Sequence, residues 1–228
     1  MRPAPIAPRT ADASAAAPQR DATLTGLEVR EALRSPAFYL LILAQGAGGA
    51  ATTAWITFNI PHLQSAGFSL QTTGSIVLAY GICQIGCRFA AGYIGDRFGR
   101  RRMYATGMVL MGLGMVMLAF VSPARIWLVP VVIAVFGLGN AGTIIGSSTM
   151  AADYFGTKRF ATIRGLMSSL LVPVGITIPI FVGWMVDRSG SYQTSMVILG
   201  AVTVSGALWL LLIRRPLWDN APRGAELA

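Results

Sequence analysis

The chain alternates long stretches without any charged or histidine residue with short segments in which charged residues gather. The uncharged stretches cover residues 35–61, 63–87, 103–124, 126–152, 165–186 and 189–213. Each is long enough for one helix across the hydrocarbon layer of a bilayer, which takes about 20 apolar residues. The pattern therefore predicts six transmembrane helices, near residues 37–60, 72–95, 103–121, 126–149, 164–186 and 194–213.

The composition agrees with a membrane protein. Of the 228 residues, 54% are hydrophobic and only 12% are charged, about half of the roughly 25% that is usual in soluble domains. An ordinary water-soluble fold is therefore excluded. We expect an all-α membrane protein with a single six-helix transmembrane domain at residues 36–213.

The regions outside this domain are short. Residues 1–24 are rich in Ala and Pro and lack the apolar core of a signal peptide, so we interpret them as a disordered cytoplasmic tail. Residues 25–35 predict an amphipathic juxtamembrane helix, with Thr25 as the N-cap of a capping box. Residues 214–228 are predicted to form a second cytoplasmic tail.

The distribution of basic residues predicts the orientation in the membrane. If the N-terminus is cytoplasmic, 15 of the 18 Lys and Arg residues lie on the cytoplasmic side. Only Arg125 and Arg188 then lie outside, and Arg88 lies within a helix. Short loops rich in Lys and Arg stay in the cytoplasm. We therefore predict a multi-pass protein of the cell (inner) membrane with both termini cytoplasmic.

The net charge of +9 raises the question of a nucleic-acid partner. A nucleic-acid surface gathers its basic residues on one face or along one helix. Here they are spread over several short segments between the spans, where they favour contact with anionic headgroups. The predicted partner is the lipid bilayer, and no nucleic acid is expected.

Several motifs that often mark enzymes have a simpler interpretation here. The GxGxxG pattern at 137–142 lies inside a predicted span, where glycines allow close helix packing instead of binding a dinucleotide. Cys83 and Cys87 share one helix face, but the single histidine, His62, leaves no metal-ligand cluster. Neither catalytic, cofactor-binding nor metal-binding residues are expected, and the chain is predicted not to be an enzyme.

The segment GYIGDRFGRRRM, residues 92–103, joins the second and third predicted spans. It resembles the signature loop of the major facilitator superfamily of transporters, which follows the second helix of each six-helix half. The resemblance implies a fold built of three plus three helices and a gating role for this loop. It implies a latch between Asp96 and the start of the fifth span near Arg164. The implied gating residues are Gly92, Asp96, Arg97, Gly99, Arg100, Arg101 and Arg164.

Further segments resemble one part of that family. Residues 25–39 are similar to the central loop that leads into the seventh helix of a twelve-helix carrier, and residues 153–192 are similar to the region from the tenth to the twelfth helix of bacterial monocarboxylate and oxalate/formate carriers. The resemblance implies the C-terminal half of a carrier that works by alternating access, as a symporter or antiporter. We expect its partner to be a second six-helix half or a second copy.

Arg88 is the most informative single residue. It lies eight residues before Asp96, about 12 Å into the membrane, where an arginine costs about 2.5–3.5 kcal/mol. Monocarboxylate carriers bind the substrate carboxylate with an arginine four residues before the motif glycine, which corresponds to Arg88 before Gly92. The implied substrate-binding residues are Arg88, Gln84, Asn59 and Asn140, and the implied substrate is a small organic anion such as a monocarboxylate.

Two alternatives remain open at this level. A drug-efflux carrier half has the same fold but needs no dedicated anion anchor, and a non-transporting membrane lobe needs no substrate site at all. For Arg88 itself, the alternative is a side chain that reaches toward lipid phosphates at the membrane surface. Gln84 stands where monocarboxylate carriers have an acidic residue for proton coupling, so the coupling ion is not predicted.

Overall fold

A computed structural model of the chain describes residues 26–213. In this part of the chain, α-helices and one short 3₁₀ helix follow one another without a β-strand. The elements are α1 (Val29–Arg34), α2 (Pro36–Ser65), α3 (Leu70–Phe98), α4 (Arg100–Leu118), η1 (Pro123–Arg125), α5 (Leu128–Phe155), α6 (Phe160–Ser189) and α7 (Tyr192–Leu212). The tails predicted at residues 1–24 and 214–228 lie outside the described residues.

Helices α2 to α7 overlap the six predicted spans in order. By length and composition, five of them are able to cross a membrane: α2, α3, α5, α6 and α7. Helix α4 is the exception because it has 19 residues and begins with three arginines. Four of its five methionines, at positions 103, 108, 111 and 115, are nevertheless buried. The all-helical membrane architecture is therefore confirmed, and α4 owes its central place to protein contacts.

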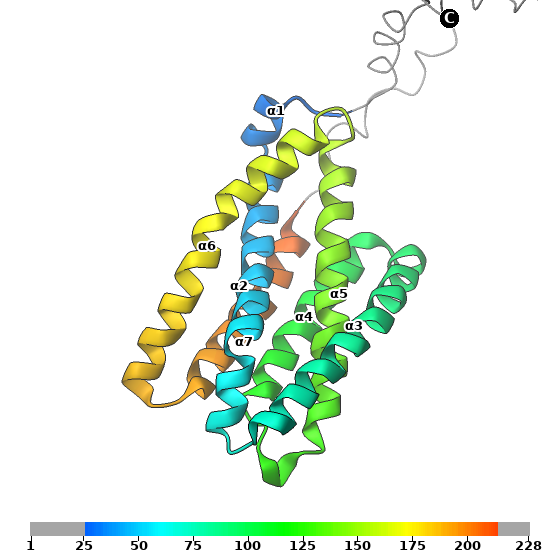
Figure 1. Ribbon diagram of the computed structural model, residues 1–228. Helices are drawn as coiled ribbons and strands as arrows, with labels where there is room; N and C mark the ends of the chain where they lie inside the picture. The colour runs from blue at the N-terminus through cyan, green and yellow to red at the C-terminus, as the bar shows by residue number, and fades with distance from the viewer. Residues whose placement is uncertain (1–25, 214–228) are drawn as a thin grey trace, which may run out of the picture.

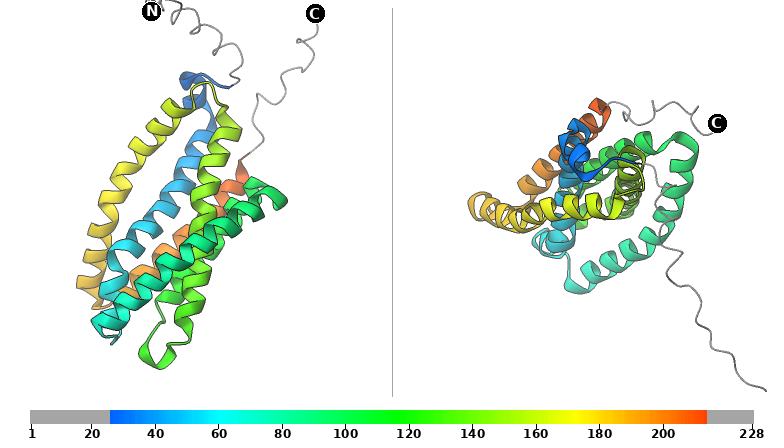
Figure 2. Two further views of the ribbon diagram at one scale, coloured as in Figure 1. Left: turned by 45° about the vertical axis from the view of Figure 1, so that its right-hand side comes forward. Right: turned by 90° about the horizontal axis from the view of Figure 1, so that it is seen from above.

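The helices form a bundle with a packed centre and two loosely covered flanks. Helix α4 packs against α5 and α7, and α7 also packs against α2. Helix α3 packs mainly against α5, and α6 packs mainly against α2. Figures 1 and 2 show α3 and α6 at opposite sides of the bundle, with α2 and α5 between them. The four helices α6, α2, α5 and α3 thus form one face, with α4 and α7 behind it.

Glycines allow the closest of these contacts. A Cβ atom on Gly142 would lie 3.3 Å from the Cα atom of Gly107, and one on Gly112 would lie 2.6 Å from the carbonyl oxygen of Gly200. Gly139 and Gly142 therefore serve α4–α5 packing, whereas Gly137 faces Cys87 of α3. The interpretation of these glycines as helix-packing residues is thus confirmed. In a membrane such small-residue surfaces replace the hydrophobic effect as the main source of helix association.

The short helix α1 is tied to the loop between α5 and α6. Its capping box is formed by Glu28 and Glu31, so the N-cap is one turn later than the predicted Thr25. The Leu27 amide donates to the Phe155 carbonyl at 2.9 Å, and Lys158 forms an ion pair with Glu28, also at 2.9 Å. The hydrogen bond and charge of Lys158 lower the pKa of the Glu28 carboxyl. This ion pair is therefore present at neutral pH and is lost only as the pH falls below about 4.5, the ordinary value.

Candidate functional site

A polar network crosses the middle of the bundle between α2, α3 and α5. The Gln84 side-chain amide donates to the Asn140 side-chain oxygen at 2.6 Å and to the Tyr80 hydroxyl at 2.9 Å. The Asn140 amide in turn donates to the Thr52 hydroxyl at 3.0 Å, and that hydroxyl donates to the Gly48 carbonyl. Two of the predicted residues, Gln84 and Asn140, are thus directly bonded to each other.

The network leaves one acceptor unused. Asn140 is only 3% exposed, and the buried side-chain oxygen of Gln84 has no hydrogen-bond partner within residues 26–213. A buried polar atom without a partner costs roughly 1–3 kcal/mol. An acceptor of this kind is satisfied by a water molecule or by a hydroxyl group of a bound solute.

Aromatic side chains enclose this network on one side. Trp55 of α2 stacks on Phe136 of α5, with ring centroids 4.0 Å apart and planes 13° apart. Tyr80 contacts both rings, at centroid distances of 4.9 Å and 5.9 Å. Thr52, Tyr80 and both rings were not predicted from the sequence. One sequence signal could have identified Tyr80, because Tyr80, Gln84 and Arg88 follow one another at four-residue steps and therefore share a helix face.

Arg88 lies on the same face of α3 as Tyr80 and Gln84, one turn closer to Asp96. Its side chain is exposed and makes no hydrogen bond or ion pair with any described residue, although its charge acts on the Tyr80 hydroxyl. Phe98, the last residue of α3, is ten positions away, about 15 Å along the axis. Within the described part of the chain, none of the five donors of this guanidinium has a partner.

The remaining predicted substrate-binding residue, Asn59, is arranged differently. Asn59 is 3% exposed and its side-chain oxygen has no partner in the described part of the chain, but it is not connected to the Gln84–Asn140 network. His62 is hydrogen-bonded to the Leu118 carbonyl at 2.9 Å. Within residues 26–213 no group of three metal-ligating side chains exists.

Arg164 occupies a second polar cluster on the same face. Near the start of α6 it donates to the Gln45 side chain of α2 at 3.2 Å, and to the hydroxyl and carbonyl of Ser147 of α5 at 3.4 Å. It does not pair with Asp96, which has no polar partner among the described residues. The reason is the helix arrangement: α3 and α6 flank opposite sides of the bundle, with α2 and α5 between them (Figure 1).

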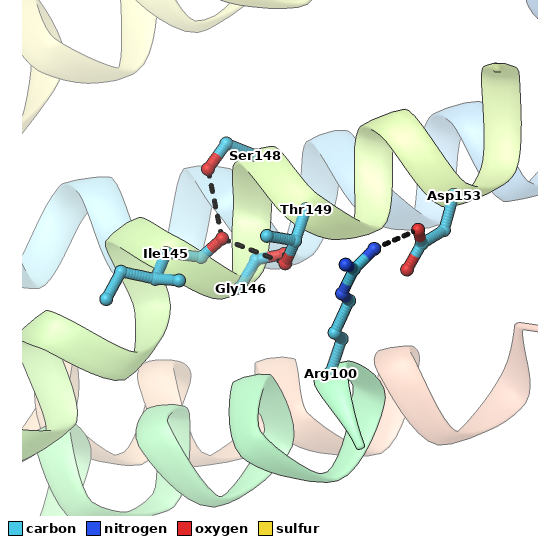
Figure 3. A network of polar contacts seen from close by, with 6 residues as sticks. All are labelled: Arg100, Ile145, Gly146, Ser148, Thr149 and Asp153. Atoms are coloured by element: carbon cyan, nitrogen blue, oxygen red, sulfur yellow. Dashed lines mark hydrogen bonds and ion pairs between the residues drawn. The ribbon is translucent and has the colours of Figure 1, made fainter. Parts of the chain in front are cut away.

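The loop between α3 and α4 is instead fixed by its arginines. Gly99 has φ +90°, a conformation that strongly favours glycine, and it is the single residue between the two helices. Arg100 forms an ion pair with Asp153 near the end of α5 (Figure 3). Arg101 donates to the Leu210 and Leu211 carbonyls at the end of α7. These contacts attach the loop to two other helices at their ends.

Comparison with known proteins identifies the family. The model of the Major Facilitator Superfamily matches residues 40–227. The chain belongs to this superfamily. It is therefore a multi-pass membrane protein of a transporter family and not an enzyme.

Curated relatives are similar over most of this chain. Protein spinster homolog 3 of Danio rerio is 29% identical over 170 residues, 72% of this chain and 32% of that protein. The probable galactarate/D-glucarate transporter GudP of Bacillus subtilis is 24% identical over 173 residues, 70% of this chain and 36% of that protein. The arabinose-proton symporter of the same organism is 28% identical over 122 residues, 52% of this chain and 24% of that protein. The chain spans about a third or less of the length of these relatives.

Proposed function

We propose that this chain is one six-helix half of a secondary carrier for small organic anions, with Arg88 as the anion-binding residue. The observation that carries the proposal is an arginine deep in an apolar helix that has no hydrogen-bond or ion-pair partner among residues 26–213. Such a residue costs about 2.5–3.5 kcal/mol in a membrane, and a bound carboxylate offsets this cost through two parallel charged hydrogen bonds.

The surroundings of Arg88 favour a polar anion. The amide and hydroxyl groups of Gln84, Asn140 and Thr52 suit hydroxyl groups, and the Trp55–Phe136 stack offers an apolar wall. The name of one relative points in the same direction, since it is a probable galactarate/D-glucarate transporter. The name of another, an arabinose-proton symporter, points to a hydroxylated solute. A carboxylate that also carries hydroxyl groups would use both Arg88 and the network, whereas a simple monocarboxylate would use Arg88 alone.

The pairing with a second half is supported by the two uncovered flanks. In an apolar 18-residue stretch of each helix, only 11% of the residues are buried in α3 and 6% in α6, against 44% to 56% in α2, α5 and α7. Large apolar side chains are exposed on both helices; they include Leu78, Ile82, Ile85 and Phe89 on α3 and Val172, Ile176 and Ile180 on α6. Two six-helix halves enclose a site near the midplane in carriers of this fold. A second half or a second copy would cover α3 and α6 and complete the site around Arg88.

The gating role of the α3–α4 loop belongs to the same proposal. Gly92 has open space around it, and Asp96 has no hydrogen-bond or ion-pair partner among residues 26–213, so both are available to the second half. Gly99 sets the turn beside them, and Arg97, Arg100 and Arg101 set the charge there, whereas Arg164 lies near the start of α6 on the other side of the bundle. In this proposal the loop and the start of α6 each approach and leave the second half as the carrier alternates.

Ligand-dependent stability tests the substrate class. We expect a hydroxylated carboxylate at millimolar concentration to raise the melting temperature of the purified chain, because a ligand that binds only the folded state stabilises it by RT ln(1 + [L]/Kd). The neutral sugar alcohol of the same carbon chain serves as the control. Equal stabilisation by acid and alcohol would contradict the anion proposal, and stabilisation by an aromatic cation alone would favour drug efflux on the Trp55–Phe136 wall.

Cysteine labelling tests the proposed orientation. In a background without Cys83 and Cys87, we expect Ser65→Cys to react with a membrane-impermeant maleimide from outside the cell, and Arg100→Cys to react only after the membrane is opened. The reason is the excess of basic residues at the Arg100 end. The reverse labelling pattern would overturn the orientation.

The same labelling assay tests the gating role of the α3–α4 loop. If the loop is a gate, adding Asp96→Asn should change the reactivity of a cysteine at position 88.

A further inference from the structure

Two hollows meet where α3, α4 and α5 come together at the Arg100 end of the bundle. One is an apolar crevice of about 290 Å³, lined by Ala91, Ile94 and Phe98 of α3, Thr106 and Leu110 of α4, and Leu138 of α5. The other is a more open hollow of about 500 Å³, lined by Arg100, Arg101, Arg102 and Asp153. Both hollows are lined by Phe98 and Arg102, so they adjoin at these two side chains. Together they are called the depression, which has an apolar and a basic part.

Arg102 differs from the other arginines of this loop. Arg100 is paired with Asp153, Arg101 with the α7 carbonyls, and Arg97 with the Tyr93 hydroxyl at 3.1 Å. Arg102 is exposed and has no hydrogen-bond or ion-pair partner within residues 26–213. Its guanidinium is therefore free at the point where the basic hollow joins the apolar crevice.

The crevice exists because α3 and α4 diverge after the tight turn at Gly99. Small residues widen it, since Ala91, Gly107 and Gly142 on its floor carry little or no side chain. Phe98 is 59% exposed at its rim, next to Arg102. In a bilayer this rim lies near the boundary between headgroups and acyl chains.

We propose that this depression binds an anionic phospholipid of the leaflet at the Arg100 end. The phosphate group would be held by the guanidinium of Arg102, which matches phosphate geometry with two parallel hydrogen bonds. One acyl chain fills the crevice between α3 and α4. Basic pockets between transmembrane helices bind anionic lipid headgroups in this way.

The two parts of the depression select this ligand over simpler ones. A free phosphate ion would use Arg102 but would leave the crevice empty. Phosphatidylcholine would fill the crevice but gain less from the basic hollow than an anionic lipid, because its choline cation offsets the charge of its phosphate. Neither hollow includes Arg88 or any residue of the Gln84–Asn140 network. The proposal is therefore independent of the substrate.

Lipid binding to the purified chain tests the proposal. The probes are phosphatidylglycerol and phosphatidylcholine with the same acyl chains, titrated in mild detergent and counted by native mass spectrometry. We expect the chain to retain phosphatidylglycerol about fivefold better, because one basic residue near the surface contributes about this factor. Arg102→Gln should reduce the preference to less than about twofold, whereas Arg97→Gln, which removes the same charge from the same loop, should preserve most of it.

A second variant tests the crevice. Thr106→Trp keeps every charge but fills the space, so we expect weaker retention of both lipids. Glycerol phosphate, which has the headgroup charge without acyl chains, should not displace phosphatidylglycerol at equal concentration. Equal retention of the two lipids by the unmodified chain, an equal loss in Arg97→Gln and Arg102→Gln, or full displacement by glycerol phosphate would each overturn the proposal.

Discussion

Arg88→Gln is expected to lower the uptake of organic anions about a hundredfold in cells that contain the chain together with its second half. Removing one partner of a buried, hydrogen-bonded charge pair costs roughly 2–5 kcal/mol, and each 1.4 kcal/mol is a factor of ten. Glutamine retains hydrogen-bonding capacity but loses the charge and the planar fork. The measurement is uptake of a radiolabelled hydroxylated carboxylate, normalised to the amount of protein in the membrane.

Two companion variants separate charge from geometry. Arg88→Lys keeps the charge but loses the bidentate fork, so we expect uptake between that of the unmodified chain and Arg88→Gln. Arg125→Gln removes one exposed charge from η1, far from the network in sequence, and should leave uptake unchanged. Equal uptake by the unmodified chain and both Arg88 variants would remove the anion-binding role. The efflux or non-transporting interpretation would then be favoured.

Asn140→Leu is expected to destabilise the chain by about 1–3 kcal/mol, because it removes the partner of both Gln84 and Thr52 and leaves a buried donor unsatisfied. The substitution keeps the side-chain volume similar, so the packing around position 140 is little affected. The measurement is the unfolding free energy in detergent with increasing denaturant. A double-mutant cycle with Gln84→Leu should give a coupling energy of about 0.5–3 kcal/mol, since the two amides are bonded directly.

Asn59→Leu provides a matched control for this experiment. Asn59 is as buried as Asn140, but its side-chain oxygen has no partner among the described residues. Replacing an unsatisfied polar group with an apolar one of similar shape is close to neutral or stabilising. If Asn59→Leu destabilised the chain as much as Asn140→Leu, the network would have no special role in holding α2, α3 and α5 together.

The sequence predicted the elements that depend on local composition. A helix in a membrane needs a run of about 20 apolar residues with no charge inside it, and this requirement can be evaluated one segment at a time. All six predicted ranges overlap a helix for this reason. The loop GYIGDRFGRRRM was sufficient to predict the family, because a tight turn at Gly99 followed by arginines is a local sequence pattern.

Contacts between helices were predicted much less well. The latch expected between Asp96 and Arg164 is not formed here, since Arg164 bonds Gln45 and Ser147. The ion pair that does anchor the loop joins Arg100 to Asp153. Each of these contacts joins residues of different helices, and the choice among several carboxylates and cations depends on how far each helix is turned and tilted.

The sequence by itself determined the membrane class, the order of the helices, the family and the positions of unusual polar residues such as Arg88 and Gln84. Only the tertiary structure decided which polar residues meet: Gln84 with Asn140, 56 residues apart, and Asn140 with Thr52, 88 residues apart. The physical reason is that membrane helices are apolar on all sides, so their hydrophobic pattern does not indicate which face is turned inward. That rotation is set by close packing at glycines such as Gly107 and Gly142, which only the folded bundle brings together.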